Sequence, residues 1–510
     1  MKRALVSVSD KSGIVAFCQA LSQLDYQIIS TGGTKKTLDE AGVSTISIDE
    51  VTAFPEMLDG RVKTLHPLIH GGLLGIRDNA SHIQQMNEHD IQPIDLVCVN
   101  LYPFKETISK ANFTHQEAIE NIDIGGPSMI RSAAKNHQFV TVVTDVNDYL
   151  LVIDEIKANG DTTLDTRCKL AAKAFRTTAA YDQMIQHYLT NQFDEENQEK
   201  KILSYELKQS LRYGENPHQK AAFYVDNENL SYSMANALQL HGKELSYNNI
   251  QDANATLQIL KEFKGQSAVV AVKHMNPCGV AISSDITSAY KKCYEADPMS
   301  IFGGIVAFNE EVNEECATMM SQIFLEIILA PSFSKEAFEI LSKKKNIRLM
   351  TFNTEGPCAS EKLVSVSGGI LVQEEDFVLE TKQSLKTVTS TKPTDGQIDD
   401  ALFGAKVCKH VKSNAIVLVK DGVTVGVGAG QMNRVGACKI ACEQAGDKAK
   451  GSVLASDAFF PMDDTVALAN EYGVSCIIQP GGSIKDQESI DLCDKCQIAM
   501  VFTGLRHFKH

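Results

Sequence analysis

The 510-residue sequence lacks a long apolar run, an excess of positive charge and a regular framework of cysteines. A membrane-spanning helix needs about 20 consecutive apolar residues, and no run reaches that length, which argues against a helix that spans a bilayer. The formal net charge of -15 argues against nucleic acid as the main partner, because a phosphate backbone requires a basic surface. The N-terminus starts basic and continues in a short apolar stretch, which is typical of a first β-strand and not of a signal peptide.

The 13 cysteines are odd in number and irregularly spaced, which predicts free thiols in a reducing cytoplasm. Cys493 and Cys496 form a C-x-x-C pair with no second pair at zinc-ribbon spacing, and we interpret them as structural. His66 and His70 have the i, i+4 spacing of a metal-binding helix, but Pro67 lies between them and no Glu follows His66. The sequence therefore predicts no metal site.

The length of the chain exceeds a single hydrophobic core and predicts an α/β protein of several domains. Strand and helix patterns alternate over 1–190, which predicts a doubly wound parallel sheet, with one long helix over 165–190. The polar segment 191–201 is the predicted linker. A second α/β region over 202–388 and a third over 389–510 share one strand–turn–helix order and could be related halves.

Polar turns follow the first two predicted strands. The first turn contains Asp10, Lys11 and Ser12, and the second, Thr31–Thr34, contains two glycines. Glycines let a phosphate approach the backbone, hydroxyls donate to its oxygens, and free amides at a helix start favour an anion. Because parallel strands end at one edge of a sheet, we predict a phosphate site there. A simple helix cap at Asp10 or Ser12 is the alternative.

Charged, hydroxyl and phenolic side chains recur later in the same region. They are Arg61, Lys63, Thr64, Tyr102, Asp123 and Lys135. On one edge of the sheet, such groups would suit proton transfer and oxyanion stabilisation on an anionic substrate. A solvated basic loop around Lys63 and simple packing of Tyr102 are the alternatives.

A lysine–histidine pair, Lys273 and His274, ends the apolar run Ala268–Val272. Strands of an open α/β sheet commonly present reactive residues at their carboxyl ends. The lysine disfavours the imidazolium form, which leaves a neutral ring able to accept a proton. We expect Asn276–Gly279 to break any regular element after the pair. A plain surface Lys-His at a strand end is the alternative.

Three further segments are rich in polar residues. Leu211–Gln219 combines Arg, Tyr, Asn, His and Gln, which predicts a loop that either takes part in the chemistry or is simply solvated. Gly426–Arg434 contains G-x-G-x-G but lacks the third glycine and the acidic residue of a dinucleotide site, so Gln431 and Arg434 favour an anion- or amide-binding turn. The basic end, Leu505–His510, is a frayed tail by default.

Ordered motifs along nearly the whole chain resemble the family of bifunctional purine biosynthesis proteins, which carry phosphoribosylaminoimidazolecarboxamide (AICAR) formyltransferase and IMP cyclohydrolase. The motifs are VSVSDKSG, STGGT, GRVKTLHP, NLYPF, NIDIGGP, LRYGENPHQ, VKHMNPCG, VKSNAIV, GAGQMNR, SDAFFP and TGLRHFKH. The resemblance implies a methylglyoxal-synthase-like α/β domain over 1–190 for the cyclohydrolase. It further implies two cytidine-deaminase-like units, over 202–388 and 389–510, for the transformylase.

The resemblance also implies the last two steps of IMP synthesis. The formyl group of 10-formyltetrahydrofolate passes to AICAR, giving FAICAR, and FAICAR closes to IMP with loss of water. A cytoplasmic homodimer whose transformylase site draws on both subunits is expected. The resemblance also allows a structural monovalent cation near Ser413 and Asp457, which the sequence itself does not show. No catalytic zinc is expected, because the sequence offers no H-x-E with a downstream P-C-x-x-C.

By the same resemblance, residues acquire expected roles. The implied catalytic residues are Lys273, His274 and Asn414 for formyl transfer, and Lys63, Tyr102, Asp123 and Lys135 for ring closure. The implied substrate-binding residues are Asp10, Lys11, Ser12, Thr31, Gly33, Thr34, Arg61, Thr64, Arg212, Tyr213, Gly304, Gln431, Arg434, Phe459, Arg506 and His510. Which side chain moves which proton in ring closure stays open.

Departures from the family pattern are few: Met275 replaces a small polar residue, 435–439 replace a more polar helix start, and Met462 replaces an aromatic residue. None removes a functional group, although folate affinity could shift. One alternative function is a lyase domain joined to an inactive partner, which the retained formyl-transfer residues argue against. Another is a nucleotide-binding regulatory protein, in which the proton-transfer residues would have no purpose.

Overall fold

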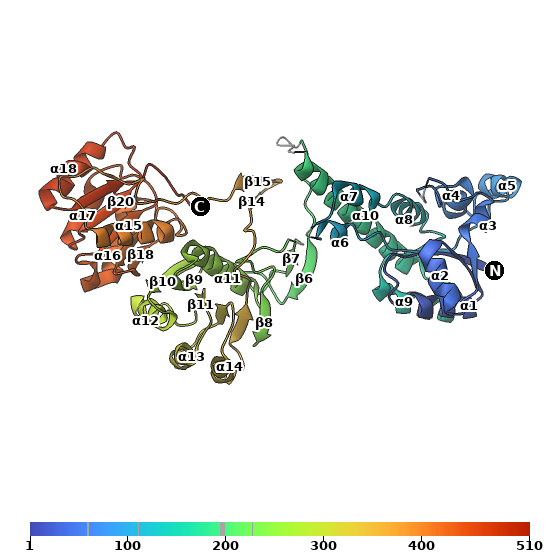
Figure 1. The fold of residues 1–510 in the computed structure, drawn as a ribbon, viewed down its shortest axis with the longest axis horizontal. Coiled ribbons are helices and arrows are strands. Elements are labelled where there is room, and N and C mark those ends of the chain that lie inside the picture. The colour runs from blue at the N-terminus through green and yellow to red at the C-terminus, as the bar shows by residue number, and fades with distance from the viewer. Residues whose placement is uncertain (59–60, 111, 194–198, 227) are drawn as a thin grey trace. The chain divides into compact units, whose positions relative to one another are not determined.

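The computed structural model describes residues 1–58, 61–110, 112–193, 199–226 and 228–510. It divides into two compact units, Met1–Ser204 and Tyr205–His510, each of which is described by itself (Figure 1). The division falls just after the predicted linker 191–201, of which 194–198 lie outside the described residues. In the described part of the chain, no helix is both long and apolar enough to cross a membrane.

Unit 1 is built on a five-stranded sheet of order β3-β2-β1-β4-β5, in which every pairing is parallel. The strands are β1 (Lys2–Ser7), β2 (Tyr26–Ser30), β3 (Thr45–Ser47), β4 (Leu96–Val99) and β5 (Thr141–Val143). Apolar runs such as LVCV in β4 are buried, as parallel strands covered on both faces require. The strand order reverses between β1 and β4, which opens a crevice at their carboxyl ends.

Helices flank this sheet. They are α1 (Ile14–Gln23), α2 (Gly32–Glu40), α3 (Ile48–Thr52), α4 (Pro67–Leu74), α5 (Ala80–Glu88), α6 (Phe104–Ile108), α7 (His115–Glu120), α8 (Gly125–Lys135), α9 (Tyr149–Asn159) and α10 (Leu164–Gln192). The long helix predicted over 165–190 is confirmed as α10, whose N-cap Thr163 accepts a hydrogen bond from Thr166 N. The alternative of a simple helix cap at Asp10 or Ser12 is wrong, because Gly13 is the N-cap of α1.

Unit 2 contains a 12-stranded sheet of order β16-β21-β20-β19-β17-β18-β10-β9-β11-β12-β13-β8. In sequence order, the first six strands of this sheet are β8 (Leu238–His241), β9 (Ser267–Lys273), β10 (Asn276–Ser283), β11 (Ile305–Phe308), β12 (Ile327–Ala330) and β13 (Arg348–Thr351). The other six are β16 (Lys386–Thr387), β17 (Ile416–Lys420), β18 (Val423–Gly428), β19 (Val453–Ser456), β20 (Cys476–Gln479) and β21 (Ala499–Phe502).

The two halves of this sheet repeat one topology. Each half runs from a hairpin at the centre (β9–β10 or β17–β18) to three further strands and an antiparallel edge strand. The halves join where β10 pairs with β18. Two separate two-stranded sheets complete the unit: β6 (Glu206–Leu211) with β7 (Ala221–Val225), and β14 (Glu361–Val366) with β15 (Gly369–Glu374).

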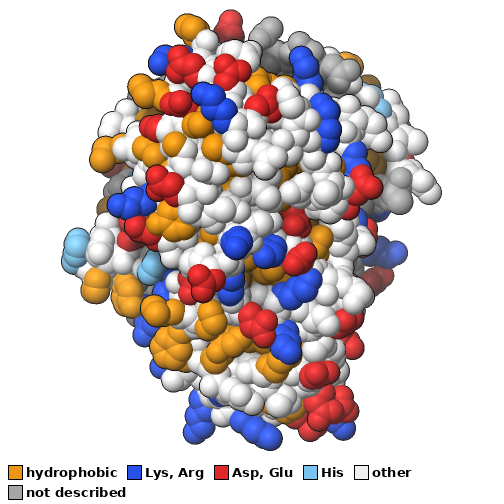
Figure 2. Space-filling model, turned by 90° about the vertical axis from the view of Figure 1, so that its left-hand side faces the viewer, with side chains coloured by type: hydrophobic (Ala, Val, Ile, Leu, Met, Phe, Trp, Pro, Cys, Tyr) orange, Lys and Arg blue, Asp and Glu red, His pale blue; other side chains and the backbone are white. Residues whose placement is uncertain are grey.

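Helices cover both faces of the large sheet. The helices α11 (Tyr247–Leu260) and α15 (Asp395–Cys408) pack on one face and share a single core that spans both halves. The other face has a core in each half, under α12 (Ile286–Ala296), α13 (Glu314–Ser321), α14 (Lys335–Leu341), α16 (Arg434–Ala445), α17 (Asp464–Glu471) and α18 (Asp486–Cys496). The surface in Figure 2 shows acidic and basic side chains interspersed on the visible face.

The contact between β18 and α16 predicts the effect of a glycine substitution. A Cβ at Gly428 would stand 1.9 Å from the carbonyl oxygen of Ala437, so Gly428→Ala must push strand and helix apart. We expect a loss of about 1–3 kcal/mol in the free energy of unfolding, measured as a lower midpoint of thermal unfolding. Gly396→Ala in α15 is the control, because nothing lies within 4 Å of its Cβ position. Equal midpoints for both variants would contradict the packing.

Candidate functional site

A cavity of about 650 Å³ opens in unit 1 at the carboxyl ends of β1, β2 and β4, the crevice where the strand order reverses. Nine residues predicted from the sequence line it: Lys11, Thr31, Gly33, Thr34, Arg61, Lys63, Thr64, Tyr102 and Asp123. They come from the turns after three strands, from the segment before α4 and from the start of α8. The sheet edge therefore brings together side chains that are far apart in the sequence.

The start of α2 forms one wall of this cavity. Thr31 is its N-cap without a side-chain cap, so the first amides of the helix are free for a ligand. Lys63 Nζ lies 3.3 Å from the position of a Cβ on Gly32, and Lys11 Nζ lies 3.8 Å from that on Gly33. Two ammonium groups above a bare helix start make a site for a phosphate or another anion.

The start of α8 forms the opposite wall. Asp123 Oδ1 accepts a hydrogen bond from Gly126 N at 2.8 Å, and Asp123 N donates to the hydroxyl of Tyr181 at 2.9 Å. Burial raises the pKa of Asp123, and backbone hydrogen bonds from Gly126 and Tyr102 only partly oppose the rise. A carboxyl group that holds its proton more tightly than usual is suited to exchange a proton with a substrate.

Gly125 and the basic residues of this site are held by close neighbours. A Cβ on Gly125 would stand 2.7 Å from Thr64 Oγ1, so only glycine fits beside that buried hydroxyl. Lys63 forms an ion pair with Glu56 at 2.6 Å, and Arg61 pairs with Glu120. The site therefore balances its cations with carboxylates that an anionic ligand would have to displace or share.

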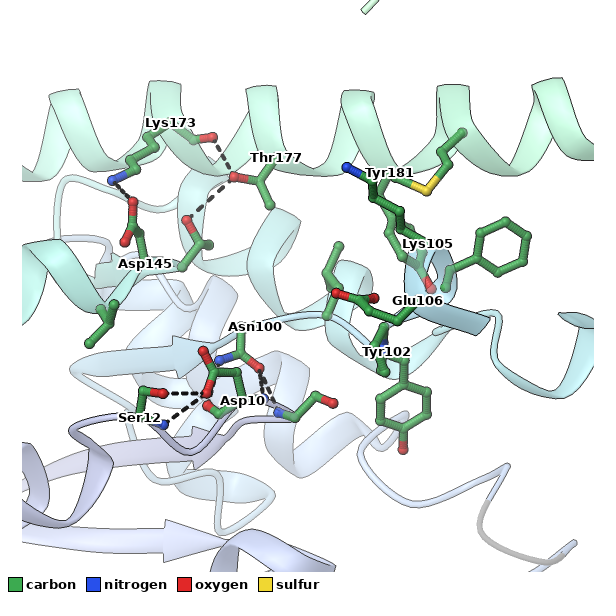
Figure 3. A pocket seen from close by; sticks show the side chains of 17 residues that line it. Asp10, Ser12, Asn100, Tyr102, Lys105, Glu106, Asp145, Lys173, Thr177 and Tyr181 are labelled. Atoms are coloured by element: carbon green, nitrogen blue, oxygen red, sulfur yellow. Dashed lines mark hydrogen bonds and ion pairs between the residues drawn. The ribbon is translucent and has the colours of Figure 1, made fainter. Parts of the chain in front are cut away.

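Three residues that were predicted for the site of unit 1 lie outside this cavity. Lys135 lies at the last turn of α8, about 15 Å from its start at 1.5 Å per residue, and lines a different cavity. The expectation that it joins Asp123 on one edge is therefore wrong. Asp10 and Ser12 line a neighbouring cavity of about 410 Å³, where Asp10 Oδ1 accepts hydrogen bonds from the amide and hydroxyl of Ser12 (Figure 3).

Asn100 is a site residue that the sequence analysis missed. Its Oδ1 accepts hydrogen bonds from Ser9 N at 2.5 Å and Asp10 N at 3.1 Å, and its Nδ2 donates to Asp10 O. Asn100 lines both cavities together with Ser9 and Tyr102 (Figure 3). A polar residue directly after the buried strand β4 was the signal that could have identified it.

The lysine–histidine pair of unit 2 lies at the tip of the β9–β10 hairpin. Lys273 pairs with Asn276, and the two residues between them, His274 and Met275, have φ of +51° and +63°. The expectation that Asn276–Gly279 end any regular element is wrong, because these residues begin β10. Two successive residues with positive φ make the tight reversal that a two-residue hairpin needs.

The turn is fixed by side chains, whereas its imidazole is left free. Asp252 Oδ1 accepts a hydrogen bond from Met275 N at 2.8 Å, and Lys273 Nζ donates to Phe302 O at 2.7 Å. Asn276 Nδ2 donates to His274 O at 3.1 Å. The ring of His274 is exposed and forms no hydrogen bond or close ion pair among the residues that the structure describes, while the carboxylate of Asp252 interacts with it electrostatically. It is therefore available to a ligand.

Asn414 lies on a segment joined to this turn. Lys412 N donates to Asn276 Oδ1 at 3.2 Å, which ties the segment before β17 to the hairpin that carries His274. Asn414 Nδ2 donates to Gln431 O at 2.8 Å, and Asn414 Oδ1 accepts from Arg434 Nη2 at 2.7 Å. Because one N–H of this amide is already used, only its second N–H remains for a ligand.

Arg434 does not act as a free anion-binding residue. Its guanidinium is buried, pairs with Asp457 and donates to Ser456 Oγ at 3.0 Å and Phe459 O at 3.1 Å. With the bond to Asn414 as well, these contacts use most of its five donors. The expectation that Arg434 holds substrate is therefore corrected: it holds Asn414 and the strand end at Asp457 in place.

The C-terminal tail is bound to the same edge and is not frayed. Ser413 N donates to Lys509 O at 2.8 Å, and His507 N donates to Asp457 O at 3.0 Å. The ring of His507 lies between Asp376, at 2.5 Å, and Glu380, at 3.1 Å. Burial alone would lower the pKa of His507, but the hydrogen bonds to Glu380 and Asp376 outweigh it and raise the pKa.

The remaining predicted residues of unit 2 are Arg212, Tyr213, Gly304, Gln431, Phe459, Arg506 and His510. Arg212 and Tyr213 stack at 5.8 Å in a loop joined to α11 by a hydrogen bond from Asn248 to Glu215 O. Gly304 is packed against the β9 backbone, because a Cβ there would stand 3.0 Å from Val272 O. The other members are Gln431, whose carbonyl holds Asn414, and the exposed Phe459, Arg506 and His510.

Within the described parts of the chain, no cluster of three or more His, Cys, Asp or Glu side chains could hold a metal ion. His66 has another use, because its Nδ1 accepts a hydrogen bond from Leu68 N at the start of α4.

Comparison with known proteins relates the whole chain to one family. The family described as AICARFT/IMPCHase bienzyme matches residues 133–444, and the MGS-like domain matches residues 13–128. Proteins named bifunctional purine biosynthesis protein PurH, from Bacillus thuringiensis (strain Al Hakam) and Bacillus mycoides (strain KBAB4), are 61% identical over 510 residues, which is 100% of each chain. The structure titled "Crystal structure of ForH" is 35% identical, covers 36% of this chain and 95% of its own, and has a TM-score of 0.33.

Removing Arg434 tests the buried network. Arg434→Met leaves Asp457 buried without its cation, and we expect a loss of about 3–5 kcal/mol in local stability. Hydrogen exchange of the α16 amides measures the effect. Lys439→Met on the same helix is the control, because its pair with Glu443 is exposed and contributes about 0.5 kcal/mol or less. Comparable losses in both variants would contradict the role of Arg434.

The raised pKa of His507 predicts that the tail loosens as the pH rises above the ordinary range of a histidine. Its ion pairs contribute fully below the ordinary value of 6.5 and are lost as the pH rises through the higher folded value. We expect the exchange protection of the Ser413 and Lys509 amides to fall over that range. His507→Gln should remove the pH dependence, and a wild-type protein whose protection is constant with pH would contradict the role of the imidazolium.

Proposed function

The chain belongs to the family of AICARFT/IMPCHase bienzymes, and we propose that its two reactions occur at two separate sites, one in each unit. As a member of this family, it is a bifunctional purine biosynthesis enzyme with AICAR formyltransferase and IMP cyclohydrolase activity. The methylglyoxal-synthase-like prediction for the first domain is confirmed. The division of labour assigns ring closure to the cavity of unit 1 and formyl transfer to the His274 turn of unit 2.

Formyl transfer needs help with a proton and with an oxyanion. The AICAR amine attacks the formyl carbon of 10-formyltetrahydrofolate, a C–N bond forms, and the folate nitrogen departs with a proton. The amine is a weak nucleophile because its lone pair delocalises into the ring, so a base must take its proton as the bond forms. The exposed ring of His274, which forms no hydrogen bond among the described residues, supports this role and is the observation that carries the proposal.

Lys273, beside His274 in the chain, and Asn414, on the segment tied to the same hairpin, offer donors for the oxyanion of the tetrahedral intermediate. Lys273 has N–H groups beyond the one that it donates to Phe302 O, and Asn414 retains its second amide N–H. Donors that are fixed before the reaction stabilise a developing charge without reorganising. Arg434 orients Asn414, and the nucleotide contacts proposed for Arg212, Tyr213 and Phe459 follow the family resemblance.

Ring closure requires attack of the FAICAR carboxamide nitrogen on the formyl carbon, followed by loss of water. The bare start of α2 with Lys11 and Lys63 supports binding of the phosphate. Asp123 and Tyr102 supply groups that exchange protons with the substrate. Burial raises the pKa of Asp123, and the side chain of Tyr102 is half-exposed in the cavity. Lys135 is left out of this site because it lies at the far end of α8.

The cosubstrate and assembly follow from the same family membership. A formyltransferase of this family uses a folate cosubstrate, and we propose 10-formyltetrahydrofolate. We also propose a homodimer and, from the 13 free cysteines, a reducing cytoplasm. We also propose the structural monovalent cation near Ser413 and Asp457, because each carboxylate oxygen of Asp457 makes one contact, with Ser413 at 2.5 Å or with Arg434, and keeps a further acceptor position. The cytidine-deaminase-like description of unit 2 stays a prediction.

Two substitutions separate the reactions. His274→Ala should reduce formyl transfer by about 10²–10⁴-fold, the usual contribution of a positioned base, while cyclisation of supplied FAICAR continues at the wild-type rate. Lys63→Ala should slow the cyclisation of FAICAR and leave formyl transfer near the wild-type rate, since it removes a cation from the proposed phosphate site at the start of α2. Both rates are measured on the full chain, with AICAR plus 10-formyltetrahydrofolate in one assay and FAICAR alone in the other.

Lys420→Ala is the matched control for both variants, because this lysine lies in the other half of the sheet and donates to Lys450 O. It should leave both rates near the wild-type values. Equal loss of both reactions in His274→Ala would overturn the division into two sites, and full cyclisation by Lys63→Ala would remove Lys63 from the mechanism.

A further inference from the structure

The duplicated topology of unit 2 places a second turn in correspondence with the one that carries His274. In the first half, β9 and β10 are joined by His274 and Met275, and in the second half β17 and β18 are joined by Asp421 and Gly422. All four residues have positive φ, between +51° and +70°. The structure therefore contains an internal control: one turn with an imidazole and one turn without.

The two turns share their supporting contacts. Asp252 Oδ1 accepts a hydrogen bond from Met275 N at 2.8 Å, and Asp400 accepts hydrogen bonds from Asp421 N at 2.9 Å and Gly422 N at 2.8 Å. Both aspartates lie in the second turn of the helix on the shared core, α11 or α15.

The lysines at the two strand ends also make matching contacts. Lys273 Nζ donates to Phe302 O and Lys420 Nζ to Lys450 O, in each case to the backbone just before the next strand of the sheet. Because the second half makes the same contacts without an imidazole, these contacts are devices that hold the turn. What distinguishes the first half is the presence of His274.

The His274–Met275 turn depends on its aspartate acceptor more than the Asp421–Gly422 turn does. His274 and Met275 both carry side chains in the left-handed region, which L-residues disfavour, whereas the second turn has glycine at its second position. A turn under this strain persists only where its surroundings fix it. In the described part of the molecule, the one side-chain acceptor bonded to the Met275 amide is the carboxylate of Asp252.

We propose that Asp252 is a positioning residue for formyl transfer: its hydrogen bond to Met275 N fixes the strained turn that presents the ring of His274. The inference rests on the proposed function of His274 and adds a residue to that site. In this role Asp252 acts through its hydrogen bond to the backbone of the turn. The sequence carries a trace of this device, because Ile250–Ala253 and Ile398–Ala401 both follow the pattern Ile-x-Asp-Ala.

The test compares Asp252 with its counterpart. Asp252→Ala should lower kcat for formyl transfer at least tenfold with little change in KM for AICAR, and should leave cyclisation of FAICAR unchanged. Asp400→Ala removes the equivalent hydrogen bonds in the other half and should leave formyl transfer within about twofold of wild type. Asp252→Asn retains an acceptor oxygen and should recover most of the activity.

A second substitution keeps the test informative if Asp252→Ala folds poorly. Met275→Gly gives the first turn the glycine that the second turn has at Gly422, so the reversal no longer depends on its acceptor. Added to Asp252→Ala, it should restore a substantial part of kcat for formyl transfer. Absence of any rescue would overturn the positioning role.

The outcomes separate this inference from the proposed function. A fully active His274→Ala would refute the proposed function itself. An inactive His274→Ala together with an Asp252→Ala as active as Asp400→Ala would refute only the role of Asp252. Loss of activity in Asp252→Asn equal to that in Asp252→Ala would show that the charge of Asp252 matters and not its hydrogen bond, which also overturns the proposal.

Discussion

The buried ion pair between Arg434 and Asp457 is the interaction on which the site of unit 2 depends. A guanidinium removed from water is stable only if its donors are satisfied, and these donors reach Asn414, Ser456 and Phe459 O. Asp457 in turn accepts the hydroxyl of Ser413, and its backbone holds the tail. Strand end, amide and C-terminus are thus fixed together by one charge pair.

Much of the fold followed from pattern alone. The alternating elements of residues 1–190 predicted the parallel sheet, and the rule that parallel strands end at one edge brought Lys11, Thr31 and Lys63 together. The distance of Lys135 from Asp123 was not anticipated. The two residues lie near opposite ends of α8, and a helix of 11 residues separates its ends by about 15 Å. The hairpin at His274 was missed because two non-glycine residues with positive φ leave no sequence signal.

The side chains that sequence reasoning misjudged share a physical feature. Arg434 was expected to bind an anion, but its charge is consumed inside the protein, which only the contacts reveal. Asn100 and Asp252 went unnoticed as site residues because they act on the backbone of a neighbouring turn and contribute no reactive group of their own. A sequence shows which chemistry a residue can do, whereas the fold decides whether its donors and acceptors remain free.

The central claim is that one chain holds two independent sites, linked only by the FAICAR that passes between them. A mixture of the two inactive variants, His274→Ala and Lys63→Ala, tests it most directly when it is supplied with AICAR and 10-formyltetrahydrofolate and IMP is followed over time. The account predicts that the mixture forms IMP although neither variant does so alone, because one makes FAICAR and the other closes it. A mixture that accumulates no IMP, with both proteins folded, would contradict it.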